Sequence, residues 1–145
     1  MSRNEIVINA PPDAVFKVLA NARCYPRWVI GARRVRNVDR DFPRQGSRFY
    51  HAVGFGPFEL RDHTEVVEVE PGRRLVLRAR ARPATVAAIA LDLEPREEKT
   101  NVVMVEEPDQ GPMRRLPKPC RDVLLGSRNA LSLVLLKHLV EHSVT

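Results

Sequence analysis

The chain has little cysteine and no long apolar run. The first argues against a cysteine-based metal or redox site, and the second against a membrane-spanning protein. Its 145 residues include two cysteines, Cys24 and Cys120, which lie far apart and form no Cys-x-x-Cys pair. This spacing argues against a zinc knuckle or a redox dithiol and favours free thiols. No stretch approaches the roughly 20 apolar residues of a membrane span, and the N-terminus lacks the apolar segment of a signal peptide. We therefore expect a soluble, cytoplasmic protein.

The charge is basic but scattered along the sequence. The formal net charge is +6, which by itself would suit a nucleic-acid partner. The arginines do not form one stripe, however, because they alternate along predicted strands or stand beside acidic residues. Solvated faces explain this distribution, so nucleic-acid binding is not expected. The length fits a single domain that spans residues 1–145.

The first thirty residues predict a strand and two short helices. Residues 5–10 have the composition of a strand, and Pro11-Pro12-Asp13 then begins a helix that continues to about Ala20. A second short helix or turn is expected over residues 24–30. These elements precede a long region of a different pattern.

The remaining chain predicts a series of strands followed by one long helix. From Arg34 to Glu107, short runs of Val, Phe and Leu are separated by Gly and Pro, which indicates about six antiparallel strands. A polar loop is expected at residues 108–119, and an uninterrupted helical pattern begins near Cys120.

This order of elements leaves few arrangements. A curved antiparallel sheet with one apolar face needs a cover, and the final helix is the only predicted element large enough to supply it. In residues 73–82 the two faces of a strand can be told apart, which fits one buried and one wet side: the first carries Leu75, Leu77, Ala79 and Ala81, and the second carries Val76, Arg78, Arg80 and Arg82. We predict an α+β fold in the order β-α-α-β6-α, in which about seven antiparallel strands wrap round the long C-terminal helix and enclose an internal cavity.

Three segments resemble a known family. The opening "IVINAPPDAVFKVLANARCYPRWV", the strand-turn-strand "VVEVEPGRRLVLR" and the terminal "LLGSRNALSLVLLKHL" resemble the polyketide cyclase/dehydrase branch of the START-like (SRPBCC) helix-grip superfamily. The resemblance spans nearly the whole chain and implies a ligand cavity between the sheet and the last helix, with Trp28 near its mouth. The superfamily includes aromatase/cyclases, lipid carriers, hormone receptors and chaperone activators, so it implies the fold more strongly than the chemistry.

Two residues of the predicted strands suggest acid–base chemistry. If "GFGP" turns the chain, His51 lies near Leu60 and Asp62 of the next strand. Alternate residues of a strand share a face, so His51 lies on the same face as Phe49, and Asp62 on the same face as Leu60. Both polar groups are therefore expected to point to the apolar side of the sheet. An imidazole beside a carboxylate in an apolar cavity has its basicity raised, which suits proton abstraction next to a carbonyl. The alternative is a buried His–Asp hydrogen bond without chemistry. His63 has the opposite parity and is expected to face solvent.

Further candidate residues come from the final helix and the apolar face of the sheet. Arg128 and Asn129 stand at the margins of the helix side that carries Leu125, where they could orient a carbonyl or hydroxyl. Alternatively, Arg128 pairs with Asp122 or a strand acid, and Trp28 simply packs against the sheet. The predicted catalytic residues are His51 and Asp62, and the predicted ligand-binding residues are Trp28, Phe49, Met104, Leu125, Arg128 and Asn129.

The sequence "HLVEH" at residues 138–142 has the spacing of a zinc-peptidase motif. Those enzymes use a third, acidic ligand further down the chain, and only three residues follow His142. Both histidines also fall away from the helix side expected to face the cavity. No metal site and no cofactor are therefore expected.

These residues support several functions. The leading one is binding of a hydrophobic, oxygenated small molecule, with polyketide cyclase or aromatase activity as its catalytic form. The alternatives are a noncatalytic lipid or isoprenoid carrier or sensor, and a protein-interaction module. A homodimer is also predicted, because Leu131, Val134, Leu135 and His138 face away from the cavity side and three of them are apolar.

Overall fold

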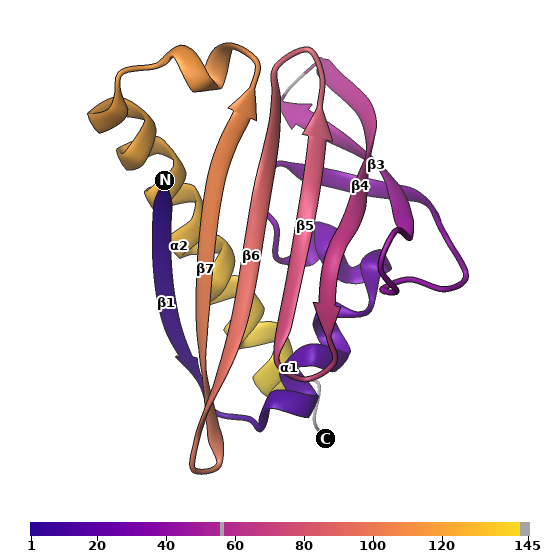
Figure 1. The fold of residues 1–145 in the computed structure, drawn as a ribbon, viewed down its shortest axis with the longest axis vertical. Coiled ribbons are helices and arrows are strands. Elements are labelled where there is room, and N and C mark those ends of the chain that lie inside the picture. Colours follow the sequence, from indigo (N-terminus) through magenta and orange to yellow (C-terminus); the bar gives the residue numbers. More distant parts are fainter. Residues whose placement is uncertain (56, 143–145) are drawn as a thin grey trace.

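The computed structural model describes residues 1–55 and 57–142, which form a seven-stranded sheet with a long helix behind it (Figure 1). Each neighbouring strand pair is antiparallel, and the strand order is β1-β7-β6-β5-β4-β3-β2. The predicted fold class and element order are confirmed. The elements are β1 (Ser2–Ile8), α1 (Pro12–Leu19), η1 (Ala22–Arg27), β2 (Ala32–Val38), β3 (Arg48–Phe55), β4 (Phe58–Glu70), β5 (Arg74–Ala81), β6 (Thr85–Arg96), β7 (Lys99–Gln110), η2 (Pro112–Arg115) and α2 (Lys118–His142).

The two short helices begin where backbone chemistry favours them. Pro12 occupies the first turn of α1, where its missing N–H costs nothing, and Asp13 lies near the positive end of the helix dipole. The following 3-10 helix η1 starts at Ala22, two residues earlier than predicted, and ends before Trp28. Tyr25 is buried there, and its hydroxyl donates to the carbonyl of Leu19 at 2.6 Å.

The two faces of the sheet differ as the alternation predicted. Leu75 and Leu77 of β5 are buried against α1, η1 and α2, whereas Arg74 and Arg78 lie on the opposite face. Arg74 forms a two-pronged ion pair with Asp92 of the neighbouring strand β6, at 2.6 and 2.7 Å. The apolar face therefore holds the core, and the charged face meets water.

The end of β7 is the main correction to the predicted element boundaries. The strand continues through Pro108 to Gln110, where a polar loop was predicted, and the register shifts there because Val86 pairs with Gln110 and Ala87 with Pro108, which leaves Asp109 of β7 as the extra residue of a bulge. The short helix η2 then leads into α2, which begins at Lys118, close to the predicted start. Gly56, in the predicted turn between β3 and β4, lies outside the described residues.

Helix α2 has one buried and one exposed side. Its buried residues pack on the sheet and are Leu125, Asn129, Ser132, Leu133, Leu136 and Val140. Leu131, Val134 and His138 are exposed as predicted, whereas Leu135 is half-buried against the core, and the homodimer itself stays a prediction. By length and composition alone α2 is apolar enough to cross a membrane, but one side of it is buried on the sheet, so this finding gives no evidence of a membrane span.

Candidate functional site

An aromatic cluster joins η1 to the inner face of β3. The ring of Tyr25 lies 5.1 Å from that of Trp28 and 5.0 Å from that of Phe49, and Phe49 lies 5.7 Å from the imidazole of His51. Trp28, Phe49 and His51 are all at least 95% buried. The structure therefore brings these three predicted site residues together in the core. The indole N–H of Trp28 is buried and has no hydrogen-bond partner among the described residues.

His51 and Asp62 lie directly opposite each other in the β3–β4 ladder. Both are buried, with 5% and 7% of their surface exposed, so the predicted register and inward parity are confirmed. Phe49 and Val66, which share their face, belong to the apolar core. A register shifted by one residue would have placed these two polar groups on opposite faces of the sheet.

The carboxylate of Asp62 is held by Arg82 and not by His51. Asp62 Oδ2 accepts from the main-chain N–H and Nε of Arg82, at 3.0 and 2.9 Å, and Oδ1 accepts from Nη2 of Arg82 at 2.8 Å. The main-chain N–H of His63 adds a further bond at 2.9 Å. These bonds outweigh the desolvation that would raise the pKa of Asp62, and they hold it well below its usual range. Asp62 is therefore an ionised, structurally engaged group.

His51 is a neutral imidazole in an apolar setting. Burial lowers the pKa of His51 from 6.5 to about 4, and this effect exceeds the opposing attraction of Asp62. The direction is opposite to the raised basicity expected from the sequence, because desolvation outweighs the attraction of Asp62, and the nearby charge of Arg36 lowers the pKa of His51 further. His51 Nδ1 is buried without a partner among the described residues. At neutral pH this ring can donate or accept one hydrogen bond, but it is a weak base.

A second polar group lies between α2 and the sheet. Nδ2 of Asn129 donates to Oε1 of Glu106 on β7 at 2.9 Å, and Nη1 of Arg128 lies 3.6 Å from Oε2 of the same carboxylate. The alternative that Arg128 pairs with a strand acid is therefore confirmed. Nε of Arg128 also donates to the carbonyl of Ile30 at 3.0 Å, which ties α2 to the segment after η1. The Oδ1 atom of Asn129 is buried without a partner among the described residues.

Two residues of this region were missed by sequence reasoning. Glu106 is 3% exposed, and the signal for it was available, because it lies two residues beyond Met104 on the same strand and must share its inward face. Arg82 was expected on the wet face with Arg78 and Arg80. It is the first residue after β5, and its backbone leaves the sheet so that it can reach Asp62.

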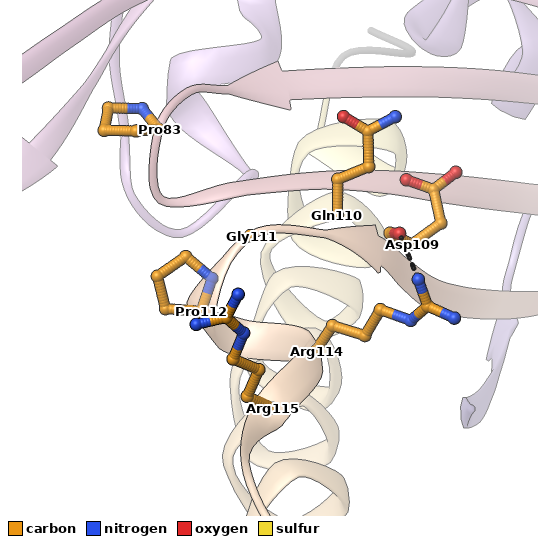
Figure 2. Close-up of a pocket in the computed structure, with 7 residues that line it drawn as sticks. All are labelled: Pro83, Asp109, Gln110, Gly111, Pro112, Arg114 and Arg115. Carbon is orange, nitrogen blue, oxygen red and sulfur yellow. Dashed lines mark hydrogen bonds between the residues drawn. The ribbon is translucent and has the colours of Figure 1, made fainter.

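The remaining predicted site residues, Met104 and Leu125, are also buried. Met104 belongs to the main apolar cluster, and Leu125 is buried outside that cluster. Described residues line two surface hollows, and none of the eight predicted site residues borders either one. The hollow of about 500 Å³ lies beside the end of β7, where Arg114 and Arg115 border it (Figure 2). The internal cavity therefore stays a prediction.

The histidines outside the core have other surroundings. His63 lies on the outer face beside Tyr50, with ring centres 5.9 Å apart, and its side chain is only 17% exposed, less than expected. His138 and His142 stack at 4.0 Å on the exposed side of α2. Within residues 1–55 and 57–142, no three His, Cys, Asp or Glu side chains come together in a way that could hold a metal ion.

The chain matches one known protein family and is similar in fold to several solved structures. The profile of the family "Polyketide cyclase / dehydrase and lipid transport" matches residues 2–131. The TTHA0849 protein of Thermus thermophilus is 18% identical with a TM-score of 0.73, and the match covers 99% of each chain. The ZhuI aromatase/cyclase of Streptomyces sp. R1128 is 16% identical with a TM-score of 0.73, and the match covers 99% of this chain and 94% of ZhuI.

A third similar structure is DynU16, a protein assigned to the dynemicin biosynthetic locus. It is 21% identical with a TM-score of 0.66, and the match covers 97% of this chain but 46% of DynU16. No curated protein matches the chain. At these identities the three structures establish a shared fold.

Proposed function

We propose, since this chain belongs to the polyketide cyclase/dehydrase and lipid transport family, that it binds a hydrophobic, oxygenated small molecule between the sheet and α2. The observation that carries this proposal is a set of buried polar atoms without partners. Among the described residues these include Nε1 of Trp28, Nδ1 of His51 and Oδ1 of Asn129. All three belong to residues that are at least 95% buried on the helix side of the sheet.

Such atoms are costly in a core that holds no ligand. A buried donor or acceptor without a partner destabilises a protein by about 1 to 3 kcal/mol. The three groups offer complementary chemistry, because the Trp28 indole donates, the Asn129 oxygen accepts, and the neutral His51 imidazole can do either. A ligand with carbonyl and hydroxyl groups on an apolar frame would satisfy all three, whereas a pure hydrocarbon would satisfy none.

A catalytic role as a cyclase is the second candidate, and it is supported by the family match and by the fold shared with the ZhuI aromatase/cyclase, whereas His51 is only a weak base. A neutral imidazole can accept a proton from a methylene between two carbonyls, and the resulting enolate carbon can then attack another carbonyl of the same chain. Asn129 and Trp28 would hold that chain in one conformation, which is the larger part of catalysis for a folding polyketide. Asp62 could join the proton transfer only after Arg82 releases it.

The test uses Trp28, the single tryptophan of the chain, as its reporter. We expect 1,8-dihydroxyanthraquinone, an oxygenated aromatic probe, to quench Trp28 fluorescence saturably in the purified protein. His51→Phe keeps the ring volume but removes the polar contact, and it should weaken probe binding about fivefold, the worth of one hydrogen bond. His63→Phe is the matched control on the outer face and should bind as the wild type does.

Two results would overturn the binding proposal. One is the absence of saturable quenching in the wild type, confirmed by calorimetry, and the other is an equal loss of affinity in both histidine variants. Native mass spectrometry of freshly purified protein gives a second readout, because a co-purifying molecule should be apolar and oxygenated. Incubation with a synthetic poly-β-ketone thioester then separates the candidates, since a cyclase that aromatises its product releases water and a carrier returns the compound unchanged.

A further inference from the structure

The exposed side of α2 carries an apolar stripe without a charged residue. The stripe consists of Cys120, Val123, Leu124, Ser127, Ala130, Leu131 and Val134, which we call the outer stripe. At 100° per residue these seven positions fall within about 60° of one line along the helix, and they extend over about 20 Å. Val123 is 68% exposed, and Leu124, Leu131 and Val134 are each just over half exposed. Contiguous exposed apolar surface of this kind marks an interaction site.

A group of cations lies at the N-terminal end of the outer stripe. It consists of Arg114, Arg115, Lys118 and Arg121, which we call the basic end. Among the described residues, no carboxylate lies within 4 Å of any of these four cationic groups. Nη1 of Arg114 donates to the main-chain carbonyl of Asp109 at 3.2 Å (Figure 2). Nη1 of Arg121 donates to the main-chain carbonyl of Arg114 at 3.1 Å. The exposed side chain of Leu116 lies between η2 and α2 in the sequence.

A second copy of the chain would cover the outer stripe, but it would bring no net negative charge to balance the positive charge of the basic end. An antiparallel pair of α2 helices would bring the basic end to the partner's C-terminal turn, which carries His138, His142 and a Lys137–Glu141 ion pair that is already internally neutral. A parallel pair would bring two basic ends together. Neither arrangement supplies the missing negative charge. An anionic lipid surface supplies it, together with an apolar layer for the stripe.

We propose that the outer stripe and the basic end dock this protein on an anionic lipid bilayer, with α2 lying in the plane of the surface. The opposite side of α2 is buried on the sheet, so the helix lies on the membrane and does not cross it. The apolar side chains enter the boundary between head groups and acyl chains, while the four cations gather at the N-terminal tip of α2. Lys118 and Arg121 project away from the stripe there, so they attract the anionic head groups across about one helix diameter, which is close to the screening length. This proposal does not depend on the ligand between sheet and helix.

The experiment is co-sedimentation of the full chain with vesicles of phosphatidylcholine, either pure or with one part in three of phosphatidylglycerol. Binding should require phosphatidylglycerol and should fall as salt rises. Val134→Glu should weaken binding, whereas Val67→Glu, an exposed valine on β4, should not. The triple variant Arg114→Gln, Arg115→Gln, Lys118→Gln should lose about fivefold per neutralised cation. The charge-matched control Arg23→Gln, Arg40→Gln, Arg44→Gln alters exposed arginines elsewhere and should bind normally.

The variants must melt like the wild type, and 1,8-dihydroxyanthraquinone binding to each of them shows separately whether the internal site is intact. Absence of binding to the phosphatidylglycerol vesicles would overturn the docking proposal, as would an equal loss in the control variants. Sedimentation velocity tests the competing partner. If the wild type sediments as a dimer that Val134→Glu dissociates, and the vesicles do not bind it, the outer stripe belongs to a second copy and the membrane proposal fails.

Discussion

The burial of His51 predicts a defined loss of stability in mild acid. Its folded-state pKa of about 4 lies below the value of 6.5 that it has when exposed, so the unfolded chain takes up a proton more readily than the folded one. Stability is therefore complete above about pH 6.5 and falls as the pH drops from there toward 4. At 1.36 kcal/mol per pH unit, the whole window corresponds to about 3 kcal/mol.

Urea unfolding at pH 7 and pH 4.5 measures this loss. We expect the wild type to lose about 2 to 3 kcal/mol between these conditions through His51. The His51→Phe variant lacks the titrating ring and should lose correspondingly less, whereas His138→Gln changes an exposed histidine and should follow the wild type. The pKa of His63 is lowered as well, chiefly by burial, so some acid sensitivity will remain in His51→Phe.

The depressed pKa of Asp62 does not confuse this measurement, because the stability it contributes is lost only at pH values below the ordinary carboxyl range, outside the chosen window. The reasoning would be refuted if His51→Phe and the wild type lost equal stability between pH 7 and pH 4.5. That result would mean that His51 is protonated with little penalty in the folded protein, and hence that it is open to water.

Three other substitutions test contacts around the core. Arg82→Gln removes the guanidinium that bonds to Asp62, so the pKa of the Asp62 carboxyl should rise toward its ordinary value, as measured by its carbon-13 chemical shift. An unchanged pKa would show that the main-chain N–H donors alone keep it low. Asn129→Ala leaves a buried oxygen of Glu106 without its donor and should lower the free energy of unfolding by about 1 to 3 kcal/mol in urea titration. Gly111→Ala places a Cβ 2.3 Å from a main-chain carbonyl oxygen at a φ of +93°, and calorimetry should show a melting temperature several degrees lower, about what 1 to 3 kcal/mol of strain produces.

The fold could be predicted from the sequence because its patterns are local and repeated. The alternation of Leu75 and Leu77 with arginine set the face of β5, and the short connection between β3 and β4 set the register of His51 against Asp62. The end of β7 could not be predicted in this way. Pro108 is usually a sign that a strand has ended, but it lies beside a bulge of β7 itself, at Asp109, and the strand continues past it to Gln110.

The charge states of the site residues could be predicted from the sequence less well than their positions. The alternation of residues along the strands predicts that His51 and Asp62 lie together on the inner face. It cannot predict that Arg82, some twenty residues later, donates hydrogen bonds to both carboxylate oxygens of Asp62. That long-range contact keeps Asp62 ionised. Burial lowers the pKa of His51 although Asp62 attracts its proton, and strand alternation cannot show which of these two effects is larger.

The place of β1 in the sheet has a consequence for how the chain acquires its structure during synthesis. β2 to β7 form a meander in which each strand pairs with the one before it, so these hairpins can form as they leave the ribosome. β1 cannot, because Ser2 pairs with Glu106 and Ile8 with Thr100. Until β7 emerges, the fully buried side chain of Ile8 has no place to pack, and closing so long a loop is slow. The nascent chain therefore carries β1 unpaired, with its apolar Ile6 and Ile8, through most of its translation, and we expect aggregation to compete with folding chiefly during this stage.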